Sequence, residues 1–298
     1  MEIPDEDLAQ RWLRTVGYYR LSIYWLPFEC PPKAGRTRSR VFKAGTRFED
    51  VRDIYVFDRE LRLLAMEAIE RVEVAVRARW TNRLSLTGGA HAYLDASNFA
   101  DRKAHLSLLG GLTSKLASSR ETFVEHYLAS YDEPAHPPLW VVTEVMEFGT
   151  LSRWVKATAD PTLKDELARD VGLPNREVLT GVLEALTYVR NVCAHHGRLW
   201  NRQMVKYVPR IKRLSVSQAL DRAKGQGTTN TVYNALTVLA HMLVHQSSDT
   251  SWPNRVRDHV ASASDQQRRA MGFPQDWQTR PVWVPRVAAS AGGASRAP

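Results

Sequence analysis

Apolar residues recur at steps of three and four along most of this 298-residue chain. The longest run extends from Asp50 to about Leu86 and stops at Gly88 and Gly89. A run that keeps the helical period almost throughout predicts one long amphipathic helix. Because hardly any stretch alternates with the period of two that strands show, the pattern predicts an all-α fold.

The same period predicts shorter helices on both sides of the long one. They are expected over residues 5–28, 102–118, 120–131, 161–171, 175–196, 229–246 and 252–263. Pro137 and Pro138 are expected to start one more helix, with a kink or break at Gly149. Residues 29–47, rich in Pro, Gly and Arg, and residues 207–227 are expected to be irregular.

The end of the chain differs in composition from the rest. Residues 287–298 are rich in Ala, Ser and Gly, and we expect them to form a disordered tail. No internal repeat divides the remainder. The sequence therefore predicts a single all-α domain over residues 1–286, followed by a disordered tail over residues 287–298.

The run over residues 188–202 carries the chemistry of most interest. It places Arg190 five residues before His195, near the end of the helix expected over residues 175–196. An arginine neutralises a phosphate, and a histidine moves a proton to or from a ribose hydroxyl or a leaving oxygen. These are the groups needed to cleave RNA without a metal ion or other cofactor.

The spacing by itself is weak, because a chain with this composition contains about one such pair by chance. On an ideal helix Asn191 and His195 share a face, whereas Arg190 lies about 140° around from His195. Gly197 stands where a left-handed cap is expected, so the pair His195 and His196 would occupy the last turn. The alternative interpretation is that these histidines only cap a helix.

Charge adds to the picture. The formal net charge is +9, which favours a polyanionic partner such as RNA, although an excess of Arg over Lys also follows from codon bias. No Asp or Glu lies between Ala185 and Leu220. The cations of that stretch are Arg190, Arg198, Arg202, Lys206, Arg210, Lys212 and Arg213. A second acid-free run holds Lys33, Arg36, Arg38, Arg40, Lys43 and Arg47. Solvated loops are an equally good interpretation of the second run.

Other constellations point to no metal site and no disulfide framework. The two cysteines are Cys30 and Cys193, and Cys193 falls on an apolar helix stripe, as a core residue would. His241 and His245 have a spacing that can bind a metal, but no third ligand accompanies them. Without an apolar stretch of about 20 residues or a signal-peptide pattern, we expect a cytoplasmic protein that does not enter a membrane.

Several blocks of this chain, in order, resemble the Abi-like family, the AbiD/AbiF-type abortive-infection proteins of the HEPN superfamily. The resemblance covers about residues 8–283. The blocks are residues 55–62 (Tyr-Val-Phe-Asp-Arg-Glu-Leu-Arg), 69–77, 137–140 (Pro-Pro-Leu-Trp), 147–152, 190–202 and 273–283. Together they are far more specific than the pair of Arg190 and His195.

The resemblance implies an HEPN-like helical bundle with additional helices and a role in phage defence or as a toxin. It also implies metal-independent RNA cleavage by Arg190, Asn191 and His195, with His196 as an auxiliary neighbour. Arg190 would stabilise the phosphorane, Asn191 would orient the phosphate or His195, and His195 would handle a proton. Because such cleavage needs both an acid and a base, the single motif implies a homodimer with a composite site.

The sequence also supports expectations about partners. RNA contacts are expected from Arg198, Arg202, Lys206, Arg210, Lys212 and Arg213, and also from Arg59 and Arg62 if the long helix packs beside residues 175–196. An antitoxin RNA or protein is a further partner consistent with the resemblance. Two alternatives to the endoribonuclease stay open: a non-catalytic RNA-binding protein of the same defence class, and an interaction module that senses a phage component.

Overall fold

The computed structural model describes residues 1–212, 214–222 and 229–285, and within these ranges the protein is all-α, as predicted. These ranges contain thirteen α-helices, and the only β-pairs in them are isolated bridges. The expected tail over residues 287–298 lies outside the described residues. In the described ranges, no helix combines the length and the apolarity needed to cross a membrane.

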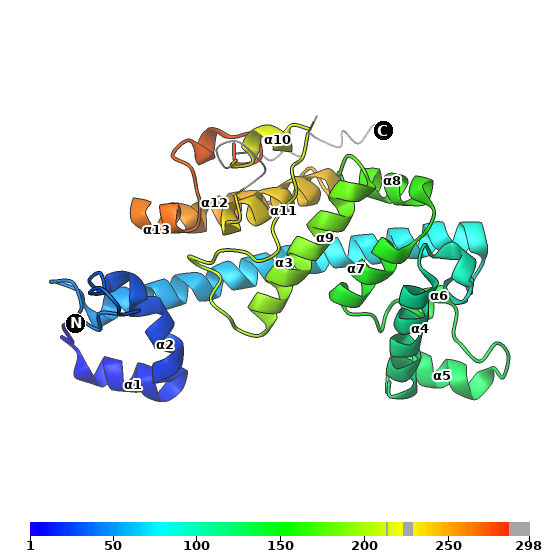
Figure 1. Ribbon diagram of the computed structural model, residues 1–298, viewed down its shortest axis with the longest axis horizontal. Coiled ribbons are helices and arrows are strands. Elements are labelled where there is room, and N and C mark those ends of the chain that lie inside the picture. The colour runs from blue at the N-terminus through cyan, green and yellow to red at the C-terminus, as the bar shows by residue number, and fades with distance from the viewer. Residues whose placement is uncertain (213, 223–228, 286–298) are drawn as a thin grey trace, which may run out of the picture.

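One helix organises the molecule. Helix α3 (Phe48–Gly88) has 41 residues and confirms the long helix predicted from the apolar period. It begins where the Asp50 carboxylate accepts the backbone N–H of Arg47 at 2.8 Å, and it ends before Gly89, whose φ is 81°. Figure 1 shows α3 spanning most of the width of the molecule, with other helices arranged along it.

The first helices lie at one end of α3. They are α1 (Glu6–Val16), α2 (Tyr18–Trp25) and the 3-10 turn η1 (Leu26–Phe28). The continuous helix predicted over residues 5–28 is thus wrong in one respect: it breaks at Gly17, whose φ of 87° lies outside the helical region. A glycine adopts this conformation without the steric cost that a side chain would add.

A second group lies at the other end of α3 (Figure 1). It comprises η2 (Ala92–Leu94), η3 (Ala96–Asn98), α4 (Arg102–Ala117), α5 (Thr122–Ser130) and α6 (Leu139–Val142). The predicted break falls before α7 (Phe148–Ala157) rather than at Gly149, which lies inside α7. A Cβ on Gly149 would stand 3.2 Å from Cγ2 of Thr187. This glycine therefore permits close packing of α7 on the helix that carries Thr187.

The remaining helices are α8 (Pro161–Asp170), α9 (Arg176–Ala194), α10 (Val216–Ala219), α11 (Val232–Gln246), α12 (Trp252–Ala261), α13 (Asp265–Ala270) and the turn η4 (Trp277–Thr279). Of these, α8, α9, α11 and α12 pack directly on α3, and α10 packs on α11. Helix α10 falls in a segment expected to be irregular. Helix α13 was not predicted from the apolar period; its start is fixed by a capping box between Ser264 and Gln267. The buried apolar side chains form a contiguous core around α3.

Candidate functional site

Helix α9 carries the candidate chemistry and packs directly on α3. It starts at the cap Asn175, whose side chain accepts the N–H of Val178 at 3.0 Å. Its buried stripe includes Val182, Leu186, Val189 and Cys193, at the steps of three and four that the sequence predicted. The opposite side of its last turns therefore faces outward, and there it presents Arg190 and Asn191.

The helix ends at Ala194, two residues before the expected end at residue 196. His195 is the C-terminal cap, and His196, with φ 57°, is the left-handed residue that was expected at Gly197. The N–H of Gly197 reaches the carbonyl of Val192 at 2.7 Å, and that of His196 reaches Cys193 at 3.0 Å. These two bonds are the Schellman arrangement. Gly197 is suited to its place because a Cβ would lie 3.1 Å from the Val192 oxygen.

This ending yields a prediction for His196. A residue with a Cβ in the left-handed region is strained, so His196→Gly is expected to stabilise the protein by about 1 kcal/mol, measured by chemical denaturation. If the His196 side chain takes no part in function, the same variant should keep full activity. A stability equal to or below that of the parent would show that the imidazole makes compensating contacts.

Arg190 and Asn191 line a groove of about 530 Å³ between α7 and α9. The Arg190 guanidinium lies 3.4 Å from Oδ1 of Asn191. Arg153 and Lys206 add positive charge to the groove walls, and Glu147 and Glu184 add negative charge. The hydroxyl of Thr187, another wall residue, is buried without a hydrogen-bond partner among the described residues.

The positive charge of Arg190 acts on the pKa values of two carboxylates, Glu73 and Glu147. Burial raises the pKa of Glu73, on α3, while the positive charges of Arg77 and Arg190 oppose that shift. A hydrogen bond from Lys115 lowers the pKa of Glu147, and the charges of Arg190 and Arg153 act in the same direction. Glu73 also pairs with Arg77 at 2.8 Å, and its proximity to Arg190 on another helix has no signal in the apolar period.

His195 lies one turn beyond Asn191, and its backbone N–H donates to the Asn191 carbonyl at 3.0 Å. Its side chain is exposed, and in the described part of the chain the imidazole makes no hydrogen bond. The structure thus brings Arg190 and Asn191 together in the groove, while His195 is not among the residues that line it. This agrees with the angular separation of Arg190 and His195 expected from helix geometry.

A buried carboxylate holds the turn that follows His196. Asp58, fully buried on α3, accepts the N–H groups of Leu199 at 3.1 Å and Trp200 at 2.5 Å. It also accepts the hydroxyl of Tyr24 at 2.6 Å and pairs with Arg62. Burial raises the pKa of Asp58, and the Arg62 charge and the donated hydrogen bonds oppose that shift. Asp58 therefore ties α2, α3 and the end of α9 together.

The buried position of Arg62 changes its assignment. Its side chain is 7% exposed and is occupied by Asp58 and by the Tyr24 hydroxyl, 3.1 Å away. A guanidinium engaged in this way supports the fold, so we do not carry Arg62 into the proposed RNA surface. Its neighbour Arg59 points to solvent on the same helix and stays in that surface.

The basic residues after α9 divide into two groups. Arg198 donates to the Ile23 carbonyl at 2.6 Å, and burial lowers its pKa. Arg202 donates to the Arg198 carbonyl at 2.6 Å and to the Tyr188 hydroxyl at 3.1 Å, so both arginines brace the turn. The exposed cations of the stretch are Lys206, Arg210 and Lys212. Lys206 pairs loosely with Glu184 at 3.5 Å, and Arg213 lies outside the described residues.

Cys193 is a core residue in the structure. Its side chain is buried, and burial raises the pKa of its thiol to about 12. Because the thiolate is the reactive form, Cys193 is expected to resist an alkylating reagent at pH 8 in the folded protein, whereas the half-buried Cys30 reacts. Mass spectrometry of labelled peptides, with and without denaturant, measures this. Labelling of both cysteines at equal rates without denaturant would contradict the burial.

The two histidines of α11 do not form a shared site in this structure. His241 uses Nε2 to contact the Gly172 carbonyl at 2.7 Å. The ring of His245 packs over the same glycine, where a Cβ would stand 2.8 Å from it. No group of three or more potential ligands gathers in the part of the chain that the structure describes.

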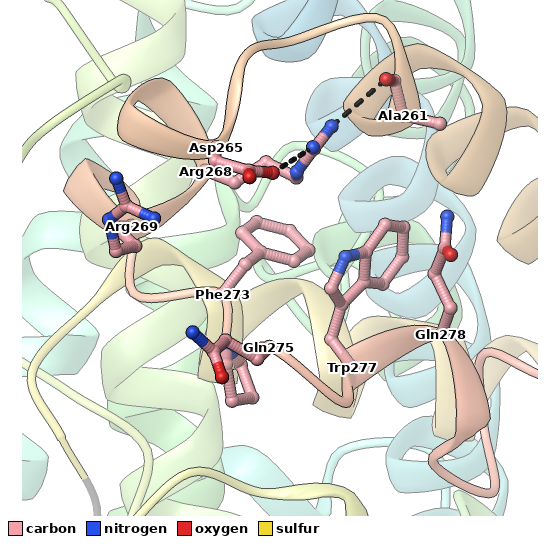
Figure 2. Close-up of a pocket in the computed structure, with 9 residues that line it drawn as sticks. Ala261, Asp265, Arg268, Arg269, Phe273, Gln275, Trp277 and Gln278 are labelled. Carbon is pink, nitrogen blue, oxygen red and sulfur yellow. Dashed lines mark hydrogen bonds and ion pairs between the residues drawn. The ribbon is translucent and has the colours of Figure 1, made fainter.

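A separate pocket of about 410 Å³ lies between α12, α13 and η4 (Figure 2). Phe273 and Trp277 form one wall, and Arg269 and Gln278 stand at its rim. Arg268 is occupied, because it donates to the Ala261 carbonyl at 2.9 Å and pairs with Asp265. With no histidine or free acid–base pair among its lining residues, this pocket is not where we place the chemistry.

Fold and site together define an all-α protein with an Arg-Asn pair and a nearby His at the end of a helix braced on one long helix. The sequence profile of the Abi-like protein family matches residues 11–201, from α1 through the turn after α9. The chain belongs to the Abi-like family, which points to abortive infection, a form of phage defence. Arg190, Asn191 and His195 lie inside the matched region, and the pocket of Figure 2 lies outside it. Comparisons with curated proteins and with solved structures found no match.

Proposed function

We propose that this protein is a metal-independent endoribonuclease of the HEPN type that acts in abortive infection or as a toxin. The proposal rests on the arrangement of side chains at the end of α9. There Arg190 and Asn191 line a groove with further cations, and one turn later follows His195, whose imidazole makes no hydrogen bond to any residue that the structure describes. Arginine and histidine at this spacing supply charge stabilisation and proton transfer for a phosphodiester.

The proposed reaction is an internal transesterification. The ribose 2′-oxygen attacks the adjacent phosphorus and loses its proton, while the 5′-oxygen leaves and gains one. The products end in a 2′,3′-cyclic phosphate and a 5′-hydroxyl. Arg190 stabilises the negative charge of the phosphorane, Asn191 orients the phosphate or the imidazole, and His195 handles one of the two protons. The exposed Arg59, Lys206, Arg210 and Lys212 attract the RNA backbone.

One motif supplies one histidine, whereas the reaction uses an acid and a base. We therefore propose a homodimer in which two copies of the end of α9 share one RNA phosphate. The open groove at Arg190 supports this, because the site is accessible to a second chain. Sedimentation analysis combined with a cleavage assay tests the idea: a stable monomer that retains full cleavage would contradict it.

A second candidate function is a non-catalytic RNA-binding protein of the same defence class. The observation that favours it is that His195 does not line the groove that holds Arg190. Such a protein would hold a structured or non-coding RNA through the same cations. An RNA or protein antitoxin that occupies the groove is consistent with either function.

The test is a cleavage assay in EDTA that compares the purified protein with its Arg190→Ala/His195→Ala double variant and identifies the product ends. Cyclic phosphate ends made only by the parent protein are the expected result. Equal activity of the two proteins would overturn the assignment of the site. RNA binding without cleavage by either protein would favour the binding function.

A further inference from the structure

A second pocket, of about 400 Å³, lies between α2 and the loop over residues 29–42. The function proposed above does not use it. Its lining is aromatic and basic: Tyr18, Tyr19, Trp25, Phe42, Arg38 and Arg40. Part of this lining belongs to the second acid-free run noted in the sequence, for which solvated loops were an equal interpretation.

Two of the aromatic rings, Tyr18 and Tyr19, are exposed, and they contact each other edge-on with centroids 5.7 Å apart. Tyr19 is 88% exposed and Tyr18 is 61% exposed, although both belong to a regular helix. Tyr18 packs edge-on against the largely buried Trp25, with ring centroids 5.1 Å apart. Trp25 in turn contacts Phe42 at 6.2 Å. Exposed aromatic rings on a fixed base are the platforms on which unpaired bases stack.

Backbone pairing holds the loop under the rings. The N–H of Cys30 donates to the Val41 carbonyl at 2.8 Å, and that of Lys43 donates to the Phe28 carbonyl at 2.9 Å. Glu29, the acid in the pocket lining, pairs with Arg38 and accepts the backbone N–H of Arg40 at 3.2 Å. The Arg38 guanidinium and the Arg40 backbone are therefore placed before any ligand arrives, and the Glu29 charge is neutralised by Arg38.

The cations of this loop that are not paired with Glu29 are suited to bind a phosphate. The Arg40 guanidinium is exposed and has no hydrogen-bond or ion-pair partner among the described residues. Lys33 and Arg36, in the same loop, are exposed as well. An aromatic platform beside unpaired cations combines the two contacts that single-stranded RNA makes with proteins, base stacking and phosphate pairing.

The pocket shares helix α2 with the candidate active site. Arg20, the residue after Tyr19, donates to the His196 carbonyl at 2.6 Å. Arg198 donates to the Ile23 carbonyl of the same helix at 2.6 Å. Helix α2 thus lines the pocket with Tyr18 and Tyr19 and braces the histidine turn with Arg20 and Ile23, so the pocket and the turn share one helix.

We propose that this pocket is a subsite for an unpaired nucleotide of the RNA that the protein cleaves. Tyr19 stacks on the base, and Arg40 contacts the adjacent phosphate. The inference rests on the proposed function for the choice of RNA, and it adds that the substrate is single-stranded where it contacts α2.

The test measures binding of a fluorescein-labelled ten-nucleotide uridylate with 2′-O-methyl groups, which cannot undergo the transesterification. Tyr19→Ala is expected to weaken binding on the order of ten-fold, while Tyr19→Phe, which keeps the ring, binds like the parent. Arg40→Asn, whose new residue tolerates the left-handed φ of 57°, is expected to reduce the salt dependence by about one phosphate contact. Matched controls at the opposite end of the molecule are Tyr131→Ala, at the end of α5, and Arg102→Asn, on α4.

Each other outcome decides the matter. Unchanged binding by Tyr19→Ala, equal loss in Tyr19→Phe, or no binding by the parent would overturn the subsite. A decaglutamate peptide that displaces the uridylate as well as unlabelled uridylate does would show that the pocket responds to charge alone, which also overturns it. Cleavage of unmodified RNA, measured in parallel, separates the two proposals. If the parent protein cleaves RNA and Tyr19→Ala cleaves and binds it equally well, the subsite alone is overturned. If binding depends on Tyr19 but no cleavage occurs, the nuclease function alone is overturned.

Discussion

Replacement of His195 by alanine is expected to lower the rate of RNA cleavage by about 10²–10⁴-fold, the usual contribution of a positioned general acid or base. The fold should not change, because the His195 side chain is exposed and makes no hydrogen bond within the described residues. Single-turnover cleavage and thermal unfolding, measured on the same preparation, separate a loss of chemistry from a loss of structure.

The matched control is His126→Ala, which removes an exposed histidine of α5, at the other end of α3. It should cleave at the parent rate. RNA binding by His195→Ala should also stay within about two-fold of the parent, because a proton-transfer group acts in the transition state. Cleavage that survives in His195→Ala at the parent rate would remove this residue from the mechanism.

The second large effect is expected at Asp58. Asp58→Ala should destabilise the protein by about 3–5 kcal/mol, the usual cost of removing one partner of a buried ion pair. The variant leaves the Arg62 guanidinium and the N–H groups of Leu199 and Trp200 without their acceptor. Urea unfolding of the parent and the variant measures the difference.

Asp53→Ala is the control on the same helix. The Asp53 carboxylate is exposed and, among the described residues, pairs with Arg52 alone, an interaction worth about 1 kcal/mol at most. Near-equal unfolding midpoints for Asp58→Ala and Asp53→Ala would contradict the anchoring role. If Asp58 also positions the histidine turn, the milder Asp58→Asn should slow cleavage more than its loss of stability explains at a temperature where both proteins are folded.

The long helix could be predicted because its apolar period runs without interruption, and local signals mark both ends. Asp50 caps its first turn and Gly89 adopts the conformation that ends it. Helix α13 could not be predicted in this way, because it is short and has no fully buried residue. The placement of Gly149 depended on a neighbour 38 positions away in the sequence, since it packs against Thr187.

In the candidate site, too, some features follow from local sequence and others depend on distant partners. The separation of Arg190 from His195 follows from helix geometry, whereas Asn191, expected on the same face as His195, lines the groove with Arg190. The roles of Arg62 and Glu73 depend on partners that are distant in the sequence. Arg62 donates to the hydroxyl of Tyr24, and the charge of Arg190 opposes the rise in the pKa of Glu73. A period of apolar residues shows which face of a helix is buried, but not which polar residues of that face have partners.

The central claim is that the end of α9 catalyses attack by a ribose 2′-hydroxyl. The most direct measurement uses an RNA whose cleavage position has been mapped, and compares it with the same RNA carrying a single 2′-deoxy nucleotide there, in EDTA. We expect the deoxy substitution to abolish cleavage at that position while the RNA still binds. Cleavage of the deoxy RNA at an unchanged rate would contradict it, because no 2′-oxygen would be present to attack.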